Sequence, residues 1–292
     1  MFSPKLTKKI SDAGLTESII SNLVRLAIEE DLAGGSDATS LATVTAEQMS
    51  NTEFRNRKPG IVSGLIVAAA VLEYCKITDY DFYYSDGQYV SENSRLMSVK
   101  GNTRSILLAE RTALNFLGRL SGISTLTNAW VKEVSEFKTK IRDTRKTTPG
   151  YRELEKYAVR MGGGTNHRMS LSDAALIKDN HVMAAGGVVP ALNQVIAKYP
   201  TLPIEIEVDT IAQLTEILNF NVDLVMLDNM TPEQCREAVQ LVAGKFQLEA
   251  SGGITLENAK TYAATGIDYL AIGALTHSAM NLDIGLDFLG EK

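Results

Sequence analysis

The sequence predicts an α/β protein whose second half is an irregular or incomplete (β/α) barrel. From residue 138 onward, short apolar strands alternate with helical stretches, as they do where helical crossovers join parallel strands. Each strand ends in a polar cluster, and (β/α) barrels build their sites at the carboxyl ends of strands. A doubly wound sheet is the alternative, but no glycine-rich turn follows a first strand, as a dinucleotide-binding fold requires.

Length and composition fit one large α/β domain or two smaller ones. Of the 292 residues, 45% are apolar and 22% are charged, which is ordinary for a globular protein. The net charge of −6 argues against nucleic-acid binding, but the basic residues between Arg104 and Lys178 indicate focused anion binding. Cys75 and Cys235 offer no disulfide framework or metal spacing. The longest apolar run, Ile61–Leu72, is too short to span a bilayer and the N-terminus lacks a signal-peptide core, so we expect a cytoplasmic protein without membrane contact.

The first part of the chain mixes helices and strands. Hydrophobic periodicity predicts helices at Glu17–Ile28 and Leu65–Tyr74. Two β-rich segments, Tyr80–Tyr84 and Arg95–Lys100, are separated by a turn at Asp86-Gly87 and predict strands. This part is therefore expected to be a mixed α/β structure.

A long helical pattern covers residues 104–136. Gly118 and Gly122 are expected to break or kink this helix. Arg104 and Arg111 are seven residues apart and so share one helical face. Such an arginine stripe is most often solvated, and the alternative is that it faces a partner subunit or an anion.

Six strands are predicted in the second half of the chain. They are Ile141, Ala174–Ile177, Ile204–Val208, Val222–Leu227, Phe246–Ala250 and Ile267–Ile272. A short seventh strand is expected near Asn166–Met169. The helical stretches among them are Tyr151–Met161, Thr210–Leu218, Pro232–Val242 and Leu256–Ala264. A regular barrel has eight strands, so this one is expected to be irregular or incomplete.

Cationic side chains follow the first predicted strand. Arg145 and Lys146 come directly after Asp143 and Thr144. Arginine offers a planar fork to a carboxylate or phosphate, and lysine offers a mobile point charge. Adjacent cations repel each other unless an anion lies between them, so residues 143–147 are predicted to be the centre of a site. An exposed basic turn is the alternative.

Two further groups of basic residues lie nearby in the sequence. The loop Gly162–Arg168 carries His167 and Arg168 on a run of three glycines, which permit close approach of the backbone to a ligand or simply end a helix. Lys178 ends the next strand and would pair with a phosphate or, in its neutral form, act as a Schiff-base nucleophile. The second option describes an aldolase-like barrel.

Two carboxylates and two glycine-bearing loops end the later strands. Glu207 and Asp228 could hold Mg²⁺, bind ribose hydroxyls or stabilise positive charge, and salt bridges to the basic cluster are the alternative. A non-enzymatic phosphate-binding module gains nothing from such carboxylates, so they favour an enzyme. The late loops are predicted to offer backbone N–H groups to a phosphate. Their residues are Ser251, Gly252, Gly253, Gly273, Ala274, Leu275 and His277.

Ordered motifs along the whole chain resemble those of the quinolinate phosphoribosyltransferase family. The motifs are Glu-Arg-Thr-Ala-Leu-Asn at 110–115, Asp-Thr-Arg-Lys-Thr-Thr-Pro-Gly at 143–150, Gly-Gly-Gly-Thr-Asn-His-Arg at 162–168, Leu-Ile-Lys-Asp-Asn-His at 176–181, Glu-Ile-Glu-Val-Asp at 205–209, Leu-Asp-Asn at 227–229 and Ser-Gly-Gly at 251–253. The resemblance implies an N-terminal α/β sandwich domain and an irregular seven-stranded α/β barrel. It places the sandwich at 1–118, the barrel at 119–280, and a segment that returns to the N-terminal domain at 281–292.

The resemblance also implies a reaction. Phosphoribosyl pyrophosphate and quinolinate would give nicotinate mononucleotide, pyrophosphate and CO₂, with Mg²⁺, in NAD biosynthesis. By motif, the quinolinate carboxylates would be held by Arg145, His167, Arg168 and Lys178. Lys146 would meet phosphate or pyrophosphate, with Thr144 beside it. The 5′-phosphate would be surrounded by Ser251, Gly252, Gly253, Gly273, Ala274, Leu275 and His277.

Glu207 and Asp228 would serve the ribose and Mg²⁺, directly or indirectly, and would be catalytic together with Lys146 and Lys178. Arg111 resembles the arginine that the family inserts into the neighbouring subunit's site, which implies at least a homodimer. A related pyrophosphorylase that accompanies molybdenum transport operons is a rival interpretation. The intact Lys178 motif and the His-Arg pair at 167–168 favour the quinolinate enzyme.

Overall fold

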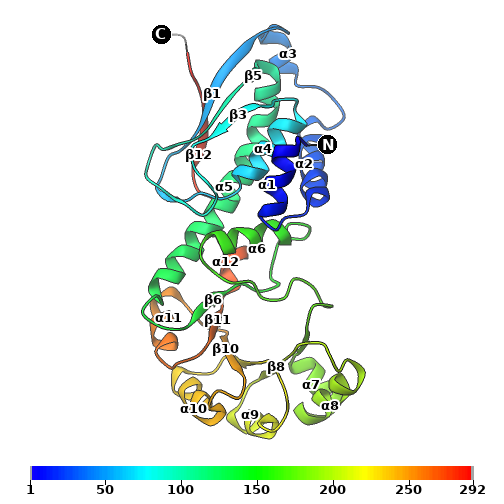
Figure 1. The fold of residues 1–292 in the computed structure, drawn as a ribbon, viewed down its shortest axis with the longest axis vertical. Helices are drawn as coiled ribbons and strands as arrows, with labels where there is room; N and C mark the ends of the chain where they lie inside the picture. The colour runs from blue at the N-terminus through cyan, green and yellow to red at the C-terminus, as the bar shows by residue number, and fades with distance from the viewer. Residues whose placement is uncertain (1, 291–292) are drawn as a thin grey trace. The chain divides into compact units, whose positions relative to one another are not determined.

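The computed structural model describes residues 2–290, which form two compact units (Figure 1). The first unit contains the chain up to Leu126, Glu153–Gly162 and the segment from Ala279 onward. The second contains Thr127–Arg152 and Gly163–Ser278. Within the described residues, no helix has the length and apolar character needed to cross a membrane.

The first unit is built on an antiparallel sheet of order β12-β1-β5-β3. The two predicted strands are confirmed as β3 (Asp79–Phe82) and β5 (Arg95–Asn102), which pair with each other. β1 (Met49–Asn56) and β12 (Ile284–Phe288) were not predicted from the sequence. Their antiparallel pairing joins the C-terminal segment to the first unit. Residues 291 and 292 of the predicted returning segment lie outside the described residues.

Helices lie beside this sheet and complete the predicted α/β sandwich (Figure 1). The helices of this unit are α1 (Pro4–Asp12), α2 (Glu17–Leu32), α3 (Ala38–Thr43), α4 (Leu65–Tyr74), α5 (Thr103–Glu133) as far as Leu126, and α6 (Arg152–Met161) from Glu153. α2 buries Ile20, Val24 and Ile28, which recur every four residues on one face. A short pair of strands, β2 (Gly60–Ile61) and β4 (Tyr89–Val90), stands apart from the main sheet.

The predicted break in the long helix is wrong, because α5 runs without interruption through Gly118 and Gly122. These glycines instead allow a neighbouring chain segment to approach the helix. The Leu282 N–H donates a hydrogen bond of 2.9 Å to the Gly118 carbonyl. A Cβ atom at Gly122 would lie 2.0 Å from the carbonyl oxygen of Met280. Position 122 therefore requires glycine because there is no room for a side chain, and not because the backbone must be flexible.

Replacing Gly122 by alanine is therefore expected to destabilise the protein by about 3 kcal/mol, because the added methyl group meets a backbone carbonyl. Gly118→Ala is the matched variant, since its Cβ would lie 3.1 Å from the Leu282 carbonyl oxygen. Its cost is expected to stay within about 1 kcal/mol, because alanine also improves helix propensity. Thermal unfolding of both variants checks this, and equal melting temperatures would contradict it.

The second unit contains the six predicted strands, all confirmed, in one parallel sheet of order β6-β11-β10-β9-β8-β7. They are β6 (Lys140–Arg142), β7 (Ala175–Ile177), β8 (Ile204–Val208), β9 (Leu224–Asp228), β10 (Gln247–Ser251) and β11 (Tyr269–Ala271). The helices are α7 (Asp179–Ala185), α8 (Val188–Lys198), α9 (Ile211–Ile217), α10 (Pro232–Val242), α11 (Leu256–Ala263) and α12 (Ala274–His277). The expected seventh strand does not form, and a single bridge between Arg142 and Thr165 takes its place.

The two faces of this sheet differ in character. Side chains alternate along each strand, so residues such as Ile206, Val225 and Leu248 share one face, where they are at most 2% exposed. Helices α9, α10 and α11 lie on one side of these strands (Figure 1). The alternate positions carry polar side chains, including Glu207 and Asp228. The sheet therefore places the predicted site residues of three strands, Glu207, Asp228 and Ser251, on one face.

Candidate functional site

A cavity of about 470 Å³ opens at the carboxyl ends of the parallel strands. It is lined by nine of the predicted site residues, namely Thr144, Arg145, Lys146, His167, Arg168, Lys178, Glu207, Asp228 and Ser251. Leu176, Asp179 and Met226 complete the lining and were not predicted. All twelve residues belong to the second unit.

The segment after β6 is held in place by its backbone. The Lys146 N–H donates to Thr144 Oγ1 at 3.0 Å, and the Thr147 N–H donates to the Arg145 carbonyl at 2.9 Å. The Thr276 hydroxyl donates to the Lys146 carbonyl at 2.7 Å, which ties this turn to α12. The two adjacent cations are thus presented from a fixed turn and not from a loose basic loop.

The loop that carries His167 is fixed by Asp143. This carboxylate is fully buried and accepts hydrogen bonds from the His167 N–H at 2.8 Å and from the Asn166 side chain at 2.5 Å. The Arg168 N–H then donates to Nδ1 of His167 at 2.8 Å. Asp143, the first residue of the predicted segment, therefore positions the second basic group relative to the first.

Two guanidinium groups in the cavity have unused hydrogen-bond donors. The Nε atoms of Arg145 and Arg168 are buried, and neither finds an acceptor within the described part of the chain. Arg168 is anchored by one hydrogen bond from Nη1 to the Ala174 carbonyl, at 2.7 Å. Burial lowers the pKa of Arg168 below its ordinary value, and the nearby charge of Arg145 lowers it further. Buried donors and mutual repulsion together indicate a site for an anion with oxygen acceptors.

Carboxylates occupy another part of the cavity lining. Burial raises the pKa of Glu207, and the neighbouring Asp228 raises it further. The pKa of Asp228 is also raised by burial and then by Asp209. One carboxylate oxygen from each of these three residues lies within 4.8 Å of the others. Lys178 Nζ stands 4.0 Å from Glu207 Oε2, so cationic and anionic side chains meet in this part of the cavity.

Gly252 is required by the loop that follows β10. Its φ is +86°, and a Cβ atom there would lie 2.1 Å from the side-chain oxygen of Asn229. Asn229 in turn donates to Asp228 Oδ2 at 2.6 Å. Substitution of Gly252 would thus disturb an Asp228 partner as well as the loop backbone.

The remaining predicted residues lie near the cavity or away from it. A Cβ at Gly273 would contact Lys146 Cδ at 3.0 Å and His277 Nε2 at 3.2 Å, so these three residues lie together. Gly253 is next to the lining residue Ser251. Two residues of α12 differ in exposure, since Leu275 is buried and Ala274 is half-buried.

The arginine stripe of α5 divides into two different roles. Arg104 donates to the Val44 and Leu41 carbonyls and so holds the end of α3. Arg111 is exposed on the first unit, and no ion pair or hydrogen bond of its side chain occurs among the described residues. The solvated interpretation therefore fits Arg111 in a single chain, and its predicted role requires a second chain.

Three ionisable residues behind the cavity were missed by the sequence reasoning. Arg142 Nη1 stands 3.1 Å from Glu249 Oε2, and Glu205 Oε2 stands 2.8 Å from His167 Nε2. Burial, and then the charge of Glu205, raise the pKa of Glu249 to about 8. Each residue stands at an alternate position of its strand, on the same face as Glu207, and this periodicity was the available signal.

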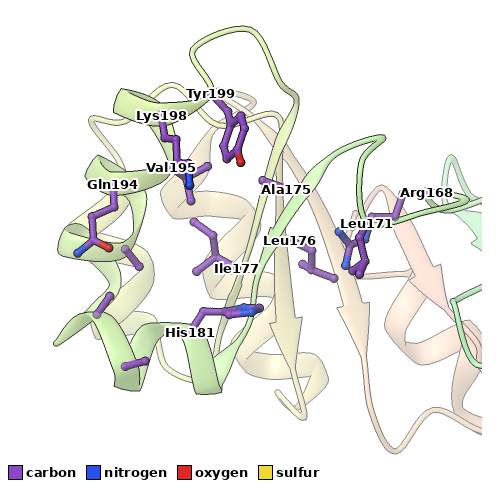
Figure 2. A pocket seen from close by; sticks show the side chains of 13 residues that line it. Arg168, Leu171, Ala175, Leu176, Ile177, His181, Gln194, Val195, Lys198 and Tyr199 are labelled. Atoms are coloured by element: carbon purple, nitrogen blue, oxygen red, sulfur yellow. The ribbon is translucent and has the colours of Figure 1, made fainter.

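A second cavity, of about 510 Å³, lies among β7, α7 and α8 (Figure 2). It shares Arg168 and Leu176 with the first cavity, but its lining is mainly apolar, including Leu171, Ile177 and Val195. The convergent charges lie in the first cavity, which is therefore the better candidate for chemistry although it is slightly smaller.

Comparison with known proteins supports the same assignment. Residues 37–121 match the N-terminal domain of quinolinate phosphoribosyl transferase, and residues 123–287 match its C-terminal domain. The chain is 50% identical over 270 residues to a carboxylating nicotinate-nucleotide pyrophosphorylase of Mycobacterium leprae, covering 90% of this chain and 95% of that protein. It is 38% identical over 287 residues to a decarboxylating quinolinate phosphoribosyltransferase of Nicotiana glauca, covering 91% and 81%. The nicotinate-nucleotide pyrophosphorylase structure from Francisella tularensis superposes with a TM-score of 0.90 at 39% identity, covering 94% and 98%.

Proposed function

Because the chain belongs to the quinolinate phosphoribosyltransferase family, we propose that it transfers the phosphoribosyl group of phosphoribosyl pyrophosphate to quinolinate and decarboxylates the product. The products would be nicotinate mononucleotide, pyrophosphate and CO₂, in NAD biosynthesis. The observation that carries this proposal is the pair of buried, unused donors on Arg145 and Arg168. Two fixed guanidinium groups suit a rigid dicarboxylate, because each offers a planar fork to one carboxylate.

The rest of the cavity suits the second substrate. Lys146 supplies a mobile charge for phosphate or pyrophosphate, with Thr144 beside it. The loop at Ser251–Gly253 and the start of α12 offer backbone N–H groups for the 5′-phosphate. Lys178 adds a polar contact to quinolinate, and His167 lines the same cavity.

The carboxylates at one end of the cavity fit Mg²⁺. Glu207, Asp209 and Asp228 offer oxygen ligands at a spacing that one ion could bridge, and Mg²⁺ prefers such ligands. When bound, Mg²⁺ supplies positive charge that stabilises the departing pyrophosphate. Asp209 was not predicted as a ligand and extends the expected pair to three.

The residues then divide the reaction between them. The quinolinate nitrogen attacks C1 of the ribose as the bond from C1 to the pyrophosphate oxygen breaks, and Glu207 and Asp228 face the positive charge that develops there. After transfer, the C2 carboxylate leaves as CO₂, its electron pair is stabilised by the adjacent pyridinium nitrogen, and C2 takes up a proton. Arg145 and Arg168 hold the ring in register throughout, so positioning supplies much of the rate.

Two further properties belong to the proposal. A homodimer is proposed because Arg111 matches the family's subunit-bridging arginine and has no partner side chain among the described residues. The cytoplasmic location expected from the sequence stays a prediction. A Schiff-base role for Lys178 is not supported, since its side chain is 50% exposed beside Glu207 and not enclosed in an apolar pocket.

The direct test is to incubate the purified protein with Mg²⁺, phosphoribosyl pyrophosphate and quinolinate, and to measure nicotinate mononucleotide and CO₂. We expect stoichiometric formation of both products, and little product when nicotinate replaces quinolinate. A preference for nicotinate, or product without CO₂ release, would exclude the proposed activity. Borohydride trapping in the presence of a carbonyl substrate should leave Lys178 unmodified.

A further inference from the structure

Behind the cavity lies a buried group of ionisable side chains that the proposed mechanism does not use. His167, Glu205 and Glu249 are 6%, 4% and 0% exposed. They come from the 163–168 loop, β8 and β10, and Glu249 is paired with Arg142 of β6. Burial of two carboxylates costs desolvation free energy even when they have partners. Their position beneath an anion site therefore suggests that they have a specific role.

The hydrogen bonds of His167 define its tautomer. Nδ1 accepts the Arg168 N–H at 2.8 Å, so this nitrogen carries no proton. The ring proton is therefore on Nε2, where the nearest carboxylate oxygen is Glu205 Oε2 at 2.8 Å. Glu249 Oε1 lies farther away, at 3.7 Å. The ring is thus held between the backbone of Arg168 and the Glu205 carboxylate.

The contact with Glu205 is too short for a shared metal ion. His167, Glu205 and Glu249 do present ligand atoms within 4.8 Å of one another. However, ligands of one tetrahedral ion at about 2.1 Å stand roughly 3.4 Å apart. The 2.8 Å separation of Nε2 and Oε2 is instead that of a close electrostatic contact between the ring edge and the carboxylate.

Glu249 supports the same loop one residue earlier. Its carboxylate holds Arg142, whose Nε donates to the Asn166 carbonyl at 3.3 Å. One oxygen of Glu205 and one of Glu249 remain buried without a hydrogen bond among the described residues. Each carboxylate therefore has one oxygen that could still accept a hydrogen bond. Both carboxylates contact the loop at residues 166–168, Glu205 directly and Glu249 through Arg142.

The loop in turn sets the position of a substrate-facing group. Arg168 carries one of the two unused guanidinium donors in the cavity, and its main chain is tied to the His167 ring. A displacement of that ring displaces the Arg168 backbone. Small errors in the placement of a binding group have large kinetic effects.

We propose that Glu205, with Glu249 behind it, is a positioning residue: it holds His167 in the Nε2–H tautomer, and His167 thereby fixes Arg168 for the substrate carboxylate. The expected kinetic effect rests on the proposed function. The expected tautomer of His167 does not depend on it. Glu205 acts through His167 and does not touch the substrate.

The kinetic test compares Glu205→Ala with Glu205→Gln. Alanine removes the acceptor, so KM for quinolinate should rise at least tenfold, as expected when a positioned group is released, while KM for phosphoribosyl pyrophosphate changes less than about twofold. Glutamine keeps an oxygen beside Nε2 and should restore most of the loss. Glu155→Ala is the matched control, because Glu155 is also 0% exposed and ion-paired, to Arg119 at 2.9 Å, but does not line the cavity. It should lower the melting temperature without separating the two KM values.

A measurement without substrate tests the tautomer. The chain has three histidines, so imidazole ¹⁵N spectra are simple, and loss of one signal in His167→Gln assigns His167. We expect a protonated Nε2 and an unprotonated Nδ1 in the wild type at neutral pH, and a mixture of tautomers in Glu205→Ala. A protonated Nδ1 in the wild type, or unchanged KM values in a folded Glu205→Ala, would overturn the inference. If the wild type made no product, the proposed function would be wrong. The ¹⁵N spectra would still test the tautomer of His167 independently of that result.

Discussion

Arg168→Lys is expected to lower kcat/KM for quinolinate by about a hundredfold although it keeps the positive charge, since lysine is not equivalent to arginine at a forked site. Arg168 donates from Nη1 to the Ala174 carbonyl, and its Nε has no acceptor among the described residues. A lysine ammonium is a single point and cannot serve both positions in the same geometry. KM for phosphoribosyl pyrophosphate should stay within about threefold, because the phosphates are held by other groups.

Steady-state kinetics with each substrate varied in turn would measure this difference. Arg145→Lys should behave in the same way, because its Nε is likewise buried without an acceptor. Arg25→Lys serves as the control, since Arg25 is an exposed arginine paired with Glu29 on α2, outside the cavity. Unchanged quinolinate kinetics in both cavity variants would mean that total charge, and not hydrogen-bond geometry, binds the substrate.

The parallel sheet was predictable because its signal is local. Each strand is a short apolar run that ends in polar residues, and parallel strands bring all such ends to one edge of the sheet. The positions of Arg145, Lys178, Glu207 and Asp228 follow from this rule alone. These four residues line one cavity in the structure, and the strand order is enough to predict that they lie together.

The missing parts of the fold depend on contacts between distant residues. β1 and β12 pair Thr52 with Phe288, and neither strand has a strong alternation by itself. Gly122 lies within an ordinary helix, and the approach of the Met280 carbonyl explains why a glycine stands there. The expected seventh strand is replaced by a loop whose side-chain bonds to Asp143 substitute for a ladder of backbone hydrogen bonds.

The buried carboxylates show a different limit of the sequence. Glu205 and Glu249 alternate with apolar residues, as exposed residues on a half-buried strand would. Their burial depends on what covers the polar face of the sheet, and the covering residue is His167 from outside the strands. Charge at an alternate strand position therefore identifies a face, but it does not tell whether that face meets solvent, ligand or protein.

Mixing Arg111→Ala with Lys146→Ala should restore activity that neither variant has alone. Each is expected to lose at least about a hundredfold in kcat/KM, because each removes a charge that meets an anionic substrate. Lys146 lines the cavity of its own chain, whereas Arg111 belongs to the first unit and does not. If Arg111 completes the partner's site, a mixed dimer has one site that lacks both groups and one site that is intact.

The size of the recovery follows from symmetry. In a two-fold dimer with random exchange of equal amounts of the variants, half of the dimers are mixed and each has one intact site of two, so about one quarter of wild-type activity should return. Lys146→Ala mixed with Lys178→Ala is the matched control, because both residues line the same cavity and every mixed site would lack one of them. Activity is measured after joint refolding of the variants. Recovery in the control, or none in the Arg111 mixture despite dimers of normal size, would show that Arg111 does not act across subunits.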